Sequence, residues 1–477
     1  MKRAIVIGSG PNGLAASIVL AQAGLAVEVF EAEPEPGGAC RSLPLTLPGF
    51  LHDFGSAVHP LAAGSPFFNT LPLANHGLEW VHGEAPVAHP LDDGTAVVLE
   101  RDLAAAEKEL GADGRAWRRL IEPFAVRWDQ LAEGALGPVL RVPCHPFLMA
   151  RFGLAAMQSA NGLAAGLSGV RARALFAGLA AHSILAFDRP FSSSAAVLLG
   201  AAAHAVGCPI PRGGAGAIPR ALIGHLQSLG GIIHTSRRID AQSFQDLATG
   251  DALTLCDTAP RALLALAGDR LAPSYRKTIQ SFEHAPGAFK VDFALSQPVP
   301  WRAAACRRAI TVHLGGTFEE IAAGEDAVAH GHHPDQPFVL AAQPTLSDPS
   351  RAPEGRHVLW AYCHVPNGST VDMTDRIEAQ IERFAPGFRD CILARRAFSP
   401  AGLEAMDANL VGGDISGGAF TVRQILFRPS LPSYSTGTSN LYLCSASTPP
   451  GGAVHGMCGF HAARLALRQA GSHITNR

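Results

Sequence analysis

The first 31 residues constrain the fold of this chain more than any other segment. Residues 4–7 (AIVI) are a short apolar run typical of a buried strand, and they lead directly into a G-x-G-x-x-G turn at residues 8–13. The pattern then predicts an alanine-rich helix over 14–23 and a second strand over 25–30, with Glu31 at its carboxyl end. A glycine-rich loop alone would lack this ordered context. The order strand, turn, helix, strand and acid predicts a dinucleotide-binding βαβ unit.

The glycines of the turn and the acid after the second strand each have a structural role in such a unit. Gly8 permits the tight turn, Gly10 lets backbone N–H groups approach a pyrophosphate, and Gly13 allows close packing of helix on strand. The helix N-terminus faces the phosphates with its partial positive charge. Glu31 can accept hydrogen bonds from both hydroxyls of an adenosine ribose, and its charge disfavours a ribose 2′-phosphate. The ligand is therefore expected to be FAD or NAD(H), not NADP(H).

The residues after the acid favour FAD. Gly37 and Gly38 form a glycine pair, and Arg41 follows after Ala39 and Cys40. With this segment the chain resembles the large flavoprotein group that includes amine oxidases, phytoene dehydrogenases and carotenoid isomerases. The resemblance implies that the glycine pair and the arginine form a second phosphate-side clamp on FAD. Many members have Gly-Gly-Arg contiguous, and the alternative for Arg41 is a surface position in a loop.

Composition narrows the class of protein. The chain has 477 residues, 47% of them hydrophobic and 16% charged, which suggests two domains with a large core. The net charge is −2 without a basic block, so nucleic-acid binding is not expected. No stretch of 18 residues is apolar throughout, and the first strand leaves no room for a signal peptide. The nine cysteines form no C-x-x-C, so we expect reduced thiols, no dithiol centre and a cytoplasmic protein.

Signals of the nucleotide domain recur in three separated parts of the chain. Residues 212–234 read as a glycine-rich turn, a helix and a strand, and after a hairpin-like stretch residues 252–257 read as a strand ending in Asp257. Residues 441–470 read as a strand, a second glycine-rich turn and a helix. The turn at 213–216 is not expected to be a separate NAD site, because it lacks a preceding strand and no acid ends the next one.

These signals predict an α/β protein with two domains. A Rossmann-like FAD-binding domain of the glutathione-reductase type would be assembled from the discontinuous segments 1–60, 208–284 and 411–477. The segments 61–207 and 285–410 would form an α+β substrate-binding domain, with a mixed sheet and helical cover over an apolar cleft. Its expected helices include 163–187 and 194–206, and its expected strands include 289–295, 310–314, 338–342 and 357–363.

The carboxyl-terminal turn carries the second part of the resemblance. Residues 449–456 (PPGGAVHG) are similar to the carboxyl-terminal flavin motif of the phytoene-dehydrogenase-like branch, which includes bacterial NAD(P)/FAD-dependent oxidoreductases. Ala453 stands where a third glycine is expected, which would fit if its φ is negative. The residues expected to bind FAD are Gly8, Gly10, Pro11, Asn12, Gly13, Glu31, Ala32, Gly37, Gly38, Arg41, Gly55, Ser56, Ala446, Gly451, Gly452 and Val454.

Lys290 is the first candidate for a catalytic residue. The run 286–301 resembles the amine-oxidase strand that ends in a Pro…Trp turn, and there the lysine reaches flavin N5 through a water. A cation at this point would stabilise negative charge on reduced flavin and assist the reduction of oxygen. The alternative is a strand lysine whose ammonium reaches solvent.

Two histidines are further candidates. His59 follows a Gly-Ser turn that usually lies beside the flavin, where an imidazole could act as a general base or orient the substrate. A capping or core histidine is the alternative for His59. His455 lies within the carboxyl-terminal motif and could contact an edge of the flavin.

Other reactive side chains were weighed and set aside. His330, His332 and His333 lie in a Gly/Pro-rich loop that does not fix metal geometry, so no metal site is expected. Cys363 and His364 are neighbours in a strand and point to opposite faces, which excludes a thiol protease pair. A covalent flavin thioether on one of two cysteines that flank the last motif is conceivable but not favoured: Cys444 and Cys458.

The leading functional hypothesis is an FAD-dependent oxidase or dehydrogenase that removes hydride from a C–C or C–N bond of a largely apolar small molecule. O2 or a quinone would reoxidise the flavin. A homodimer is plausible. The first alternative is a membrane-associated carotenoid-type desaturase or isomerase. The second is a non-catalytic binding protein on the same fold, like the GDP-dissociation inhibitors of small GTPases.

Overall fold

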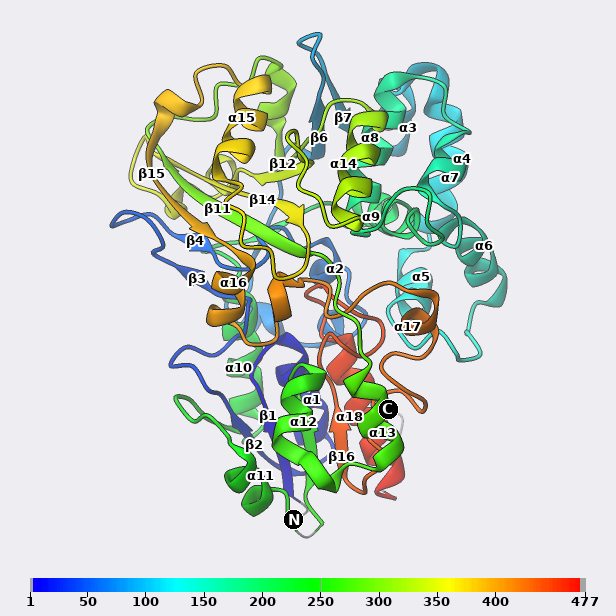
Figure 1. Cartoon of the computed structure of the whole chain (residues 1–477), viewed down its shortest axis with the longest axis vertical. Coiled ribbons are helices and arrows are strands. Elements are labelled where there is room, and N and C mark those ends of the chain that lie inside the picture. The colour runs from blue at the N-terminus through cyan, green and yellow to red at the C-terminus, as the bar shows by residue number, and fades with distance from the viewer. Residues whose placement is uncertain (1–2, 250, 472–477) are drawn as a thin grey trace.

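The computed structural model describes residues 3–249 and 251–471. Two sheets organise this part of the chain, one at each end of an elongated molecule (Figure 1). Both described ends of the chain lie at the end that holds the first sheet.

The first sheet is parallel and has five strands in the order β16-β10-β1-β2-β9. Numbered within this sheet along the chain, the order is 3-2-1-4-5 from β9 to β16, which is the doubly wound order of a Rossmann-like fold. The prediction of such a domain is confirmed. The strands are β1 (Arg3–Ile7), β2 (Ala26–Phe30), β9 (Ile232–His234), β10 (Leu253–Cys256) and β16 (Leu441–Leu443).

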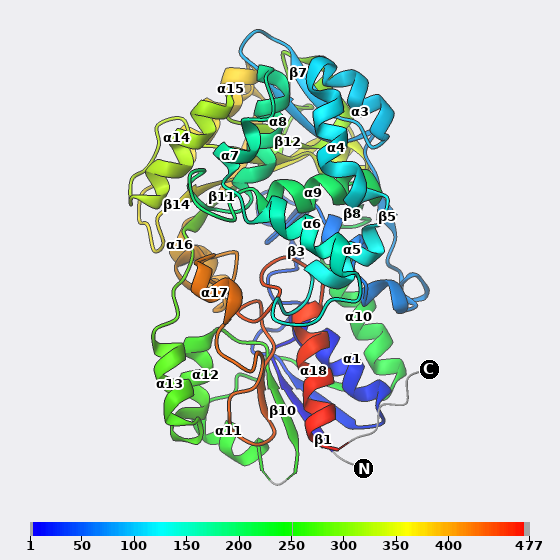
Figure 2. The same cartoon turned by 90° about the vertical axis from the view of Figure 1, so that its right-hand side faces the viewer.

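Helices cover both faces of this sheet (Figure 2). Strand β1 is apolar on both sides, with Ala4 and Val6 in one core cluster and Ile5 and Ile7 in another. Parallel strands buried on both faces have this continuous apolar pattern. One face is covered by α1 (Pro11–Gln22), α10 (Ala217–Ser228) and α18 (Met457–Gln469), the other by α11 (Ala241–Leu247), α12 (Pro260–Ala267) and α13 (Pro273–Gln280).

Two details of the expected nucleotide domain were wrong. Helix α1 begins at Pro11 and not at Leu14, because proline fits the first helical position, where its missing N–H costs nothing. The segment between β9 and β10 contains helix α11 in place of a hairpin-like stretch. Asp240 caps this helix by accepting a hydrogen bond from the Ser243 N–H at 2.8 Å.

The second sheet is mixed and has seven strands in the order β15-β11-β14-β13-β12-β6-β7. Only the β12–β6 pairing in this sheet is parallel. Its strands are β6 (Ala85–Pro90), β7 (Ala96–Leu99), β11 (Gly287–Leu295), β12 (Ala309–Leu314), β13 (Val339–Ala342), β14 (His357–Val365) and β15 (Ile392–Phe398). Two small ribbons pair β3 (Ser42–Leu43) with β4 (His52–Asp53) and β5 (Trp80–Val81) with β8 (Ile210–Pro211).

The remaining helices lie around this mixed sheet or between the two halves of the molecule, and those around the sheet form the helical cover that the sequence predicted (Figure 1). They are α2 (Pro60–Ala63), α3 (Leu103–Glu109), α4 (Gly114–Ala125), α5 (Trp128–Ala135), α6 (Pro146–Ala156), α7 (Ala160–Ala164), α8 (Val170–Ala181), α9 (Ser194–Ala205), α14 (Phe318–Ala329), α15 (Thr374–Phe384), α16 (Pro400–Met406) and α17 (Val422–Leu426). The run 163–187, expected as one helix, is broken between α7 and α8. There the Asp113 carboxylate accepts hydrogen bonds from the Ser168 and Gly169 N–H groups at 2.9 and 2.6 Å, which holds the backbone out of helix.

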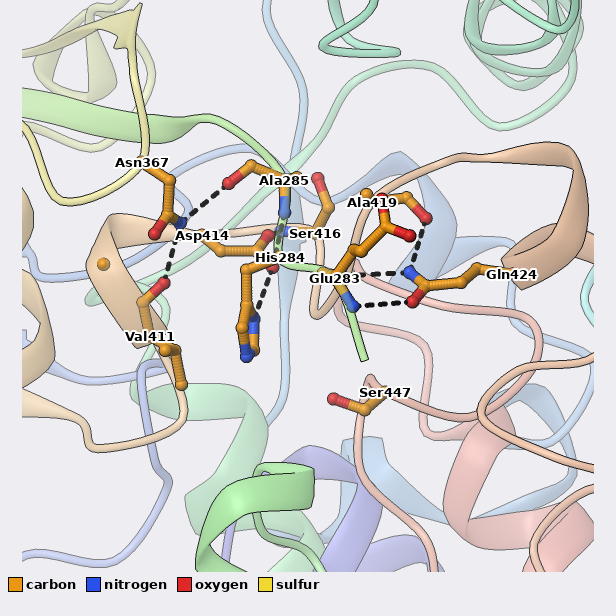
Figure 3. Close-up of polar contacts among 12 residues, drawn as sticks. Glu283, His284, Ala285, Asn367, Val411, Asp414, Ser416, Ala419, Gln424 and Ser447 are labelled. Carbon is orange, nitrogen blue, oxygen red and sulfur yellow. Dashed lines mark hydrogen bonds and ion pairs between the residues drawn. The ribbon is translucent and has the colours of Figure 1, made fainter. Parts of the chain in front are cut away.

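Side-chain amides fix the crossing between the two halves of the molecule (Figure 3). The chain leaves the nucleotide half at residues 283–285, just before β11, and lies beside the returning segment 411–424. The Gln424 amide accepts from the Glu283 N–H at 2.8 Å and donates to the carbonyls of Glu283 and Ala419, both at 2.9 Å. Asn367 donates to the carbonyls of Ala285 and Val411 at 2.8 and 3.0 Å. The two side-chain amides thereby supply hydrogen bonds to loop N–H and C=O groups that have no partner in a sheet.

Gln424→Ala should destabilise the protein by about 1–3 kcal/mol, because the buried Gln424 amide is lost and two backbone groups of residue 283 lose their partner. Chemical denaturation followed by circular dichroism measures this change. Gln242→Ala on the exposed face of α11 is the matched control and should change stability by no more than about 0.5 kcal/mol. Equal effects of the two variants would contradict a specific role for Gln424.

Candidate active site

A cavity of about 1440 Å³ runs between the carboxyl edge of the parallel sheet and one face of the mixed sheet. Most of the residues predicted to bind the cofactor line it: Gly8, Gly10, Pro11, Asn12, Glu31, Ala32, Gly38, Arg41, Gly55, Ser56, Ala446, Gly452 and Val454. The three catalytic candidates, Lys290, His59 and His455, line the same cavity. Residues from distant parts of the sequence thus converge on one space.

The nucleotide end of the cavity lies at the switch point of the parallel sheet. Strands β1 and β10 are neighbours there, and the connections after them run to opposite sides of the sheet. Open α/β sheets bind ligands in the crevice outside the carboxyl ends of such a strand pair. The Asp257 N–H donates to the Ile7 carbonyl at 2.7 Å and continues the ladder to this edge.

The glycines of the first turn are required by close packing. A Cβ atom on Gly13 would lie 2.2 Å from the Gly8 carbonyl oxygen, and one on Gly10 would lie 2.7 Å from Asp257 Oδ2. Gly8 itself has a φ of +97°, which side chains strongly disfavour. Gly13, Gly37 and Gly451 lie outside the cavity lining, so they shape the turns and helix beside it.

Glu31 is held in place by the turn that precedes it in sequence. Its Oε2 atom accepts from the Ser9 N–H at 2.9 Å and from the Ser9 hydroxyl at 2.6 Å, and its Oε1 atom accepts from the Glu33 N–H at 2.9 Å. A carboxylate can accept further hydrogen bonds, so these contacts orient it and leave it able to bind ribose hydroxyls. Sequence reasoning missed Ser9, although it lies inside the glycine motif.

Asp257 is a second acid at this edge. Its Oδ2 atom accepts from the Gly13 N–H at 2.8 Å, in the first turn of helix α1. Burial, together with the charges of Asp407 and Glu31, raises the pKa of Asp257 to about 7. The sequence predicted a strand that ends in Asp257 but gave this residue no role.

Arg41 is buried, which disagrees with the alternative of a surface loop arginine. Its guanidinium donates to the Met406 carbonyl at 2.7 Å and lies 5.5 Å from the ring centre of Phe54. Its Nε atom is buried and has no hydrogen-bond partner among the described residues. A buried cation with an unused donor at the cavity wall suits an anionic group.

Ala453 corrects an expectation about the carboxyl-terminal turn. The residue was expected to fit in place of glycine with a negative φ, yet its φ is +96°. A non-glycine residue pays a steric cost there, and such strained positions cluster at functional sites. Ala453 lines the cavity between Gly452 and Val454, so the strain lies in the segment predicted to contact flavin.

The turn at residues 213–216 already has protein partners. Contrary to expectation, a short strand, β8, precedes it, but β8 pairs with β5 and lies outside the parallel sheet. The Ala215 N–H donates to Asp53 Oδ1 at 2.7 Å, and the Gly216 N–H donates to the Ser42 hydroxyl at 3.0 Å. The N-terminus of α10 is therefore satisfied by this chain itself, in agreement with the prediction that it is not a second NAD site.

Lys290 is 3% exposed, so the alternative of a solvent-reaching lysine is wrong. Its ammonium forms an ion pair with Asp292 and lies 5.9 and 5.4 Å from the ring centres of Trp360 and Phe398. Burial lowers the pKa of Lys290, opposed by the Asp292 charge, and burial raises the pKa of Asp292 to about 6. Asp292 lies two residues from Lys290 on the same strand face, a spacing that could have identified it.

A buried group of charges continues behind this pair. His52 Nδ1 lies 3.8 Å from Asp292 Oδ1, and burial and the nearby cations lower the pKa of His52 to about 3. Arg351 and Asp53 form a fully buried ion pair at 2.9 Å. The two cations, Lys290 and Arg351, are thus paired with two carboxylates, Asp292 and Asp53, so the net charge of this buried group is near zero.

His59 and His455 are both buried, and burial lowers the pKa of each to about 4. Both are therefore neutral at pH 7 and present an Nε2 atom without a partner among the described residues. His455 Nδ1 accepts from the Met457 N–H at 3.1 Å. His59 also lies at the N-cap of α2. The residue therefore has the capping position that was its alternative interpretation, and it lines the cavity as well.

The other reactive groups have structural partners. His364 Nδ1 is 2.9 Å from Glu325, whereas Cys363 lies in the core on the opposite sheet face, as the alternation predicted. Burial raises the pKa of Cys444 and raises that of Cys458 to about 12, so both remain thiols. In the described ranges, 3–249 and 251–471, no group of His, Cys, Asp and Glu has the geometry of a metal site. Within the same ranges no helix is long and apolar enough to span a bilayer.

Comparisons with known proteins agree with this geometry. Residues 6–70 match the model of an NAD(P)-binding Rossmann-like domain. The chain is 27% identical to pyridine nucleotide-disulfide oxidoreductase domain-containing protein 2 of Mus musculus, over 98% of this chain and 93% of that protein. It is 27% identical to phytoene desaturase (lycopene-forming) of Pseudescherichia vulneris, over 96% of this chain and 97% of the relative.

Solved structures share the fold. The structure of cyclohexylamine oxidase from Brevibacterium oxydans superimposes with a TM-score of 0.59 at 14% identity, over 98% of this chain and 99% of that one. The family model and the phytoene desaturase relative agree with the nucleotide-binding and phytoene-dehydrogenase-like motifs of the sequence, and the solved structure shows that the fold is shared with an amine oxidase. The prediction of an oxidoreductase enzyme is confirmed at the level of this class.

The buried histidines predict how stability depends on pH. Burial lowers the pKa of His52, His59, His89, His182, His455 and His461 to about 3 or 4. Below pH 6.5 the unfolded chain binds protons that the folded chain excludes, so the free energy of unfolding falls on acidification. The raised pKa values of Asp257 and Asp292 act in the opposite sense but involve fewer groups. We expect a loss of about 3 kcal/mol or more between pH 6.5 and 5.5.

Denaturant unfolding at a series of pH values measures this loss. His461→Gln should reduce the pH slope by about 1 kcal/mol per pH unit, whereas His330→Gln at an exposed position should leave it unchanged. A stability that rises on acidification across this window would contradict the assignment of neutral buried histidines.

Proposed function

We propose that this chain is an FAD-dependent oxidoreductase that removes hydride from a C–C or C–N bond of a largely apolar small molecule. The observation that carries the proposal is the single cavity that joins the glycine turn and Glu31 to the buried Lys290 and the carboxyl-terminal turn. NAD(H) alone would not explain why the residues of all these segments line one space. We further propose that the protein acts in the cytoplasm, with O2 or a quinone as electron acceptor.

The residues present fit FAD. The positive end of helix α1 and the buried Arg41 suit a pyrophosphate, and Glu31 suits the adenosine ribose. Asn12 offers a buried side-chain oxygen without a partner among the described residues, at the same end of the cavity. When bound, FAD would supply the two-electron acceptor for hydride removal.

The chain's own groups would then act on position and charge. The Lys290 ammonium would stabilise negative charge at the cavity wall, and its ion pair with Asp292 would hold it in one orientation. Neutral His59 and His455 could accept or donate a proton at Nε2. The apolar walls would exclude water from the reacting bond. The names of the relatives cover desaturation and amine oxidation, which are the two bond types in the proposal.

The visible spectrum of the purified protein tests this function. We expect flavin bands at about 370 and 450 nm, bleaching with anaerobic dithionite and return of colour in air. Lys290→Met should slow that return by about tenfold or more, since it removes the buried cation and keeps an unbranched side chain that is one atom shorter. Lys277→Met, on the exposed side of α13, is the matched control and should leave the rate unchanged.

Different outcomes would redirect the proposal. Reduced flavin that persists for minutes in air would favour a quinone or protein acceptor and remove the main role of Lys290. A colourless protein that cannot be loaded with FAD would contradict the enzyme and favour a binding protein on the same fold.

A specific observation favours membrane contact as a second candidate. Met149 and Gly153 of helix α6 line the cavity. Next to them, Val142 and Phe147 are 94% and 92% exposed, and Leu154 is 73% exposed. Residues 134–157 contain two arginines, Arg141 and Arg151, and no acidic residue, so this surface would suit an anionic lipid surface.

Cosedimentation with phosphatidylglycerol vesicles measures this contact. Phe147→Asp should reduce the bound fraction at least fivefold, because a charged group replaces an apolar side chain at the interface. Leu393→Asp, on the exposed edge strand β15, is the control and should bind like the parent chain. If the parent chain does not sediment with these vesicles, the membrane-associated alternative fails and the oxidoreductase proposal is unaffected.

A further inference from the structure

A group of uncharged polar side chains lines the part of the cavity wall that is formed by the end of α8 and by β12. Ser183 and Thr311 are 4% and 5% exposed and line the cavity, yet neither hydroxyl has a hydrogen-bond partner among the described residues. Beside them, His182 and His313 line the same wall, with their Nε2 atoms 3.2 Å apart. A buried hydroxyl left unpaired loses its hydrogen bonds to water without replacement, which is unfavourable. These groups therefore need a partner inside the cavity.

The strand register gives the distance of this polar group from Lys290. Lys290 pairs with Tyr362, Tyr362 with Leu340, and Leu340 with His313, so these four residues form one row across β11, β14, β13 and β12. All four line the cavity. Three strand spacings separate the two ends of the row, which amounts to about 14 Å. Thr311 precedes His313 by two residues and lies on the same face of β12.

This polar group carries no formal charge at neutral pH. Burial lowers the pKa of His182 to about 3 and that of His313 well below its usual value, so both imidazoles are neutral. In the described part of the chain, the cavity-lining residues of α8, β12 and β13 include no Lys, Arg, Asp or Glu. An anionic or cationic group would lack a countercharge here, which disfavours a carboxylate or an ammonium.

We propose that Ser183, Thr311 and the His182–His313 pair form a subsite for an uncharged oxygen function, a hydroxyl or carbonyl, at one end of an otherwise apolar substrate. The proposal rests on the proposed function and names its substrate class. Hydroxyls and neutral imidazoles both donate and accept, so they suit either oxygen group. The row of residues then sets the distance between the bound oxygen and the Lys290 position at about 14 Å. The mostly apolar side chains between the two ends would pack against the hydrocarbon.

Isothermal titration calorimetry on the FAD-loaded protein tests the subsite. The probes are 1-dodecanol, 2-dodecanone and n-dodecane, each delivered from the same cyclodextrin carrier. We expect the alcohol and the ketone to bind about five- to tenfold more tightly than the alkane. Thr311→Val, which preserves shape, should abolish most of this preference, and Ser183→Ala should reduce it.

Controls separate the subsite from general effects. Thr254→Val changes a buried strand threonine that does not line the cavity, and it should retain the full preference for oxygenated probes. If Thr311→Val fails to fold, Ser183→Ala still tests the inference on its own. Equal affinities of the parent protein for alcohol and alkane would overturn the inference, and so would variants that weaken both probes alike.

The failure of this inference can be told from failure of the proposed function. Flavin content is read from the absorbance of the same preparation at about 450 nm. Protein that cannot be loaded with FAD contradicts the proposed function. Protein that holds FAD but does not distinguish dodecanol from dodecane contradicts the subsite alone, and would indicate that water satisfies the two hydroxyls.

Discussion

The hydrogen bond from the Gly13 N–H to the Asp257 carboxylate, at 2.8 Å, joins two segments 244 residues apart. It packs the first turn of α1 against the end of β10 at the switch point of the parallel sheet. The same closeness excludes side chains at Gly10 and Gly13. The backbone of the glycine turn therefore lies against the cavity with the positive end of the helix behind it. Every proposal for a nucleotide cofactor depends on this contact.

The mixed sheet supplies the opposite wall and divides its polar groups between two places. Lys290 and Asp292 form a buried ion pair at one end of a row of residues, while His313 and Thr311 present neutral polar atoms at the other end. Burial explains both arrangements. A buried charge is stable only where an opposite charge pairs with it, and buried polar groups without such a partner are neutral. An enzyme built in this way would hold its reacting bond near a cation and recognise its substrate at a distance.

Much of the fold could be predicted from local pattern. Residues 4–31 specified a βαβ unit because period, turn chemistry and the terminal acid all agreed within one short segment. Four of the seven strands of the second sheet, β11 to β14, were also predicted from their apolar runs, whereas β6, β7 and β15 were not. The helix over 163–187 was wrong because its break depends on Asp113, a residue 55 positions before Ser168. Such a contact leaves no trace in helical propensity.

The sequence by itself determined the Rossmann-like unit, the oxidoreductase class and the candidate cofactor residues, since these rest on spacing along one stretch of chain. Only the tertiary structure decided that Lys290 is buried and paired, that Ala453 has a positive φ, and that two hydroxyls line the cavity unpaired. The reason is physical. Burial, charge pairing and unmet hydrogen bonds depend on which distant segments pack together, and spacing within a segment carries no information about them.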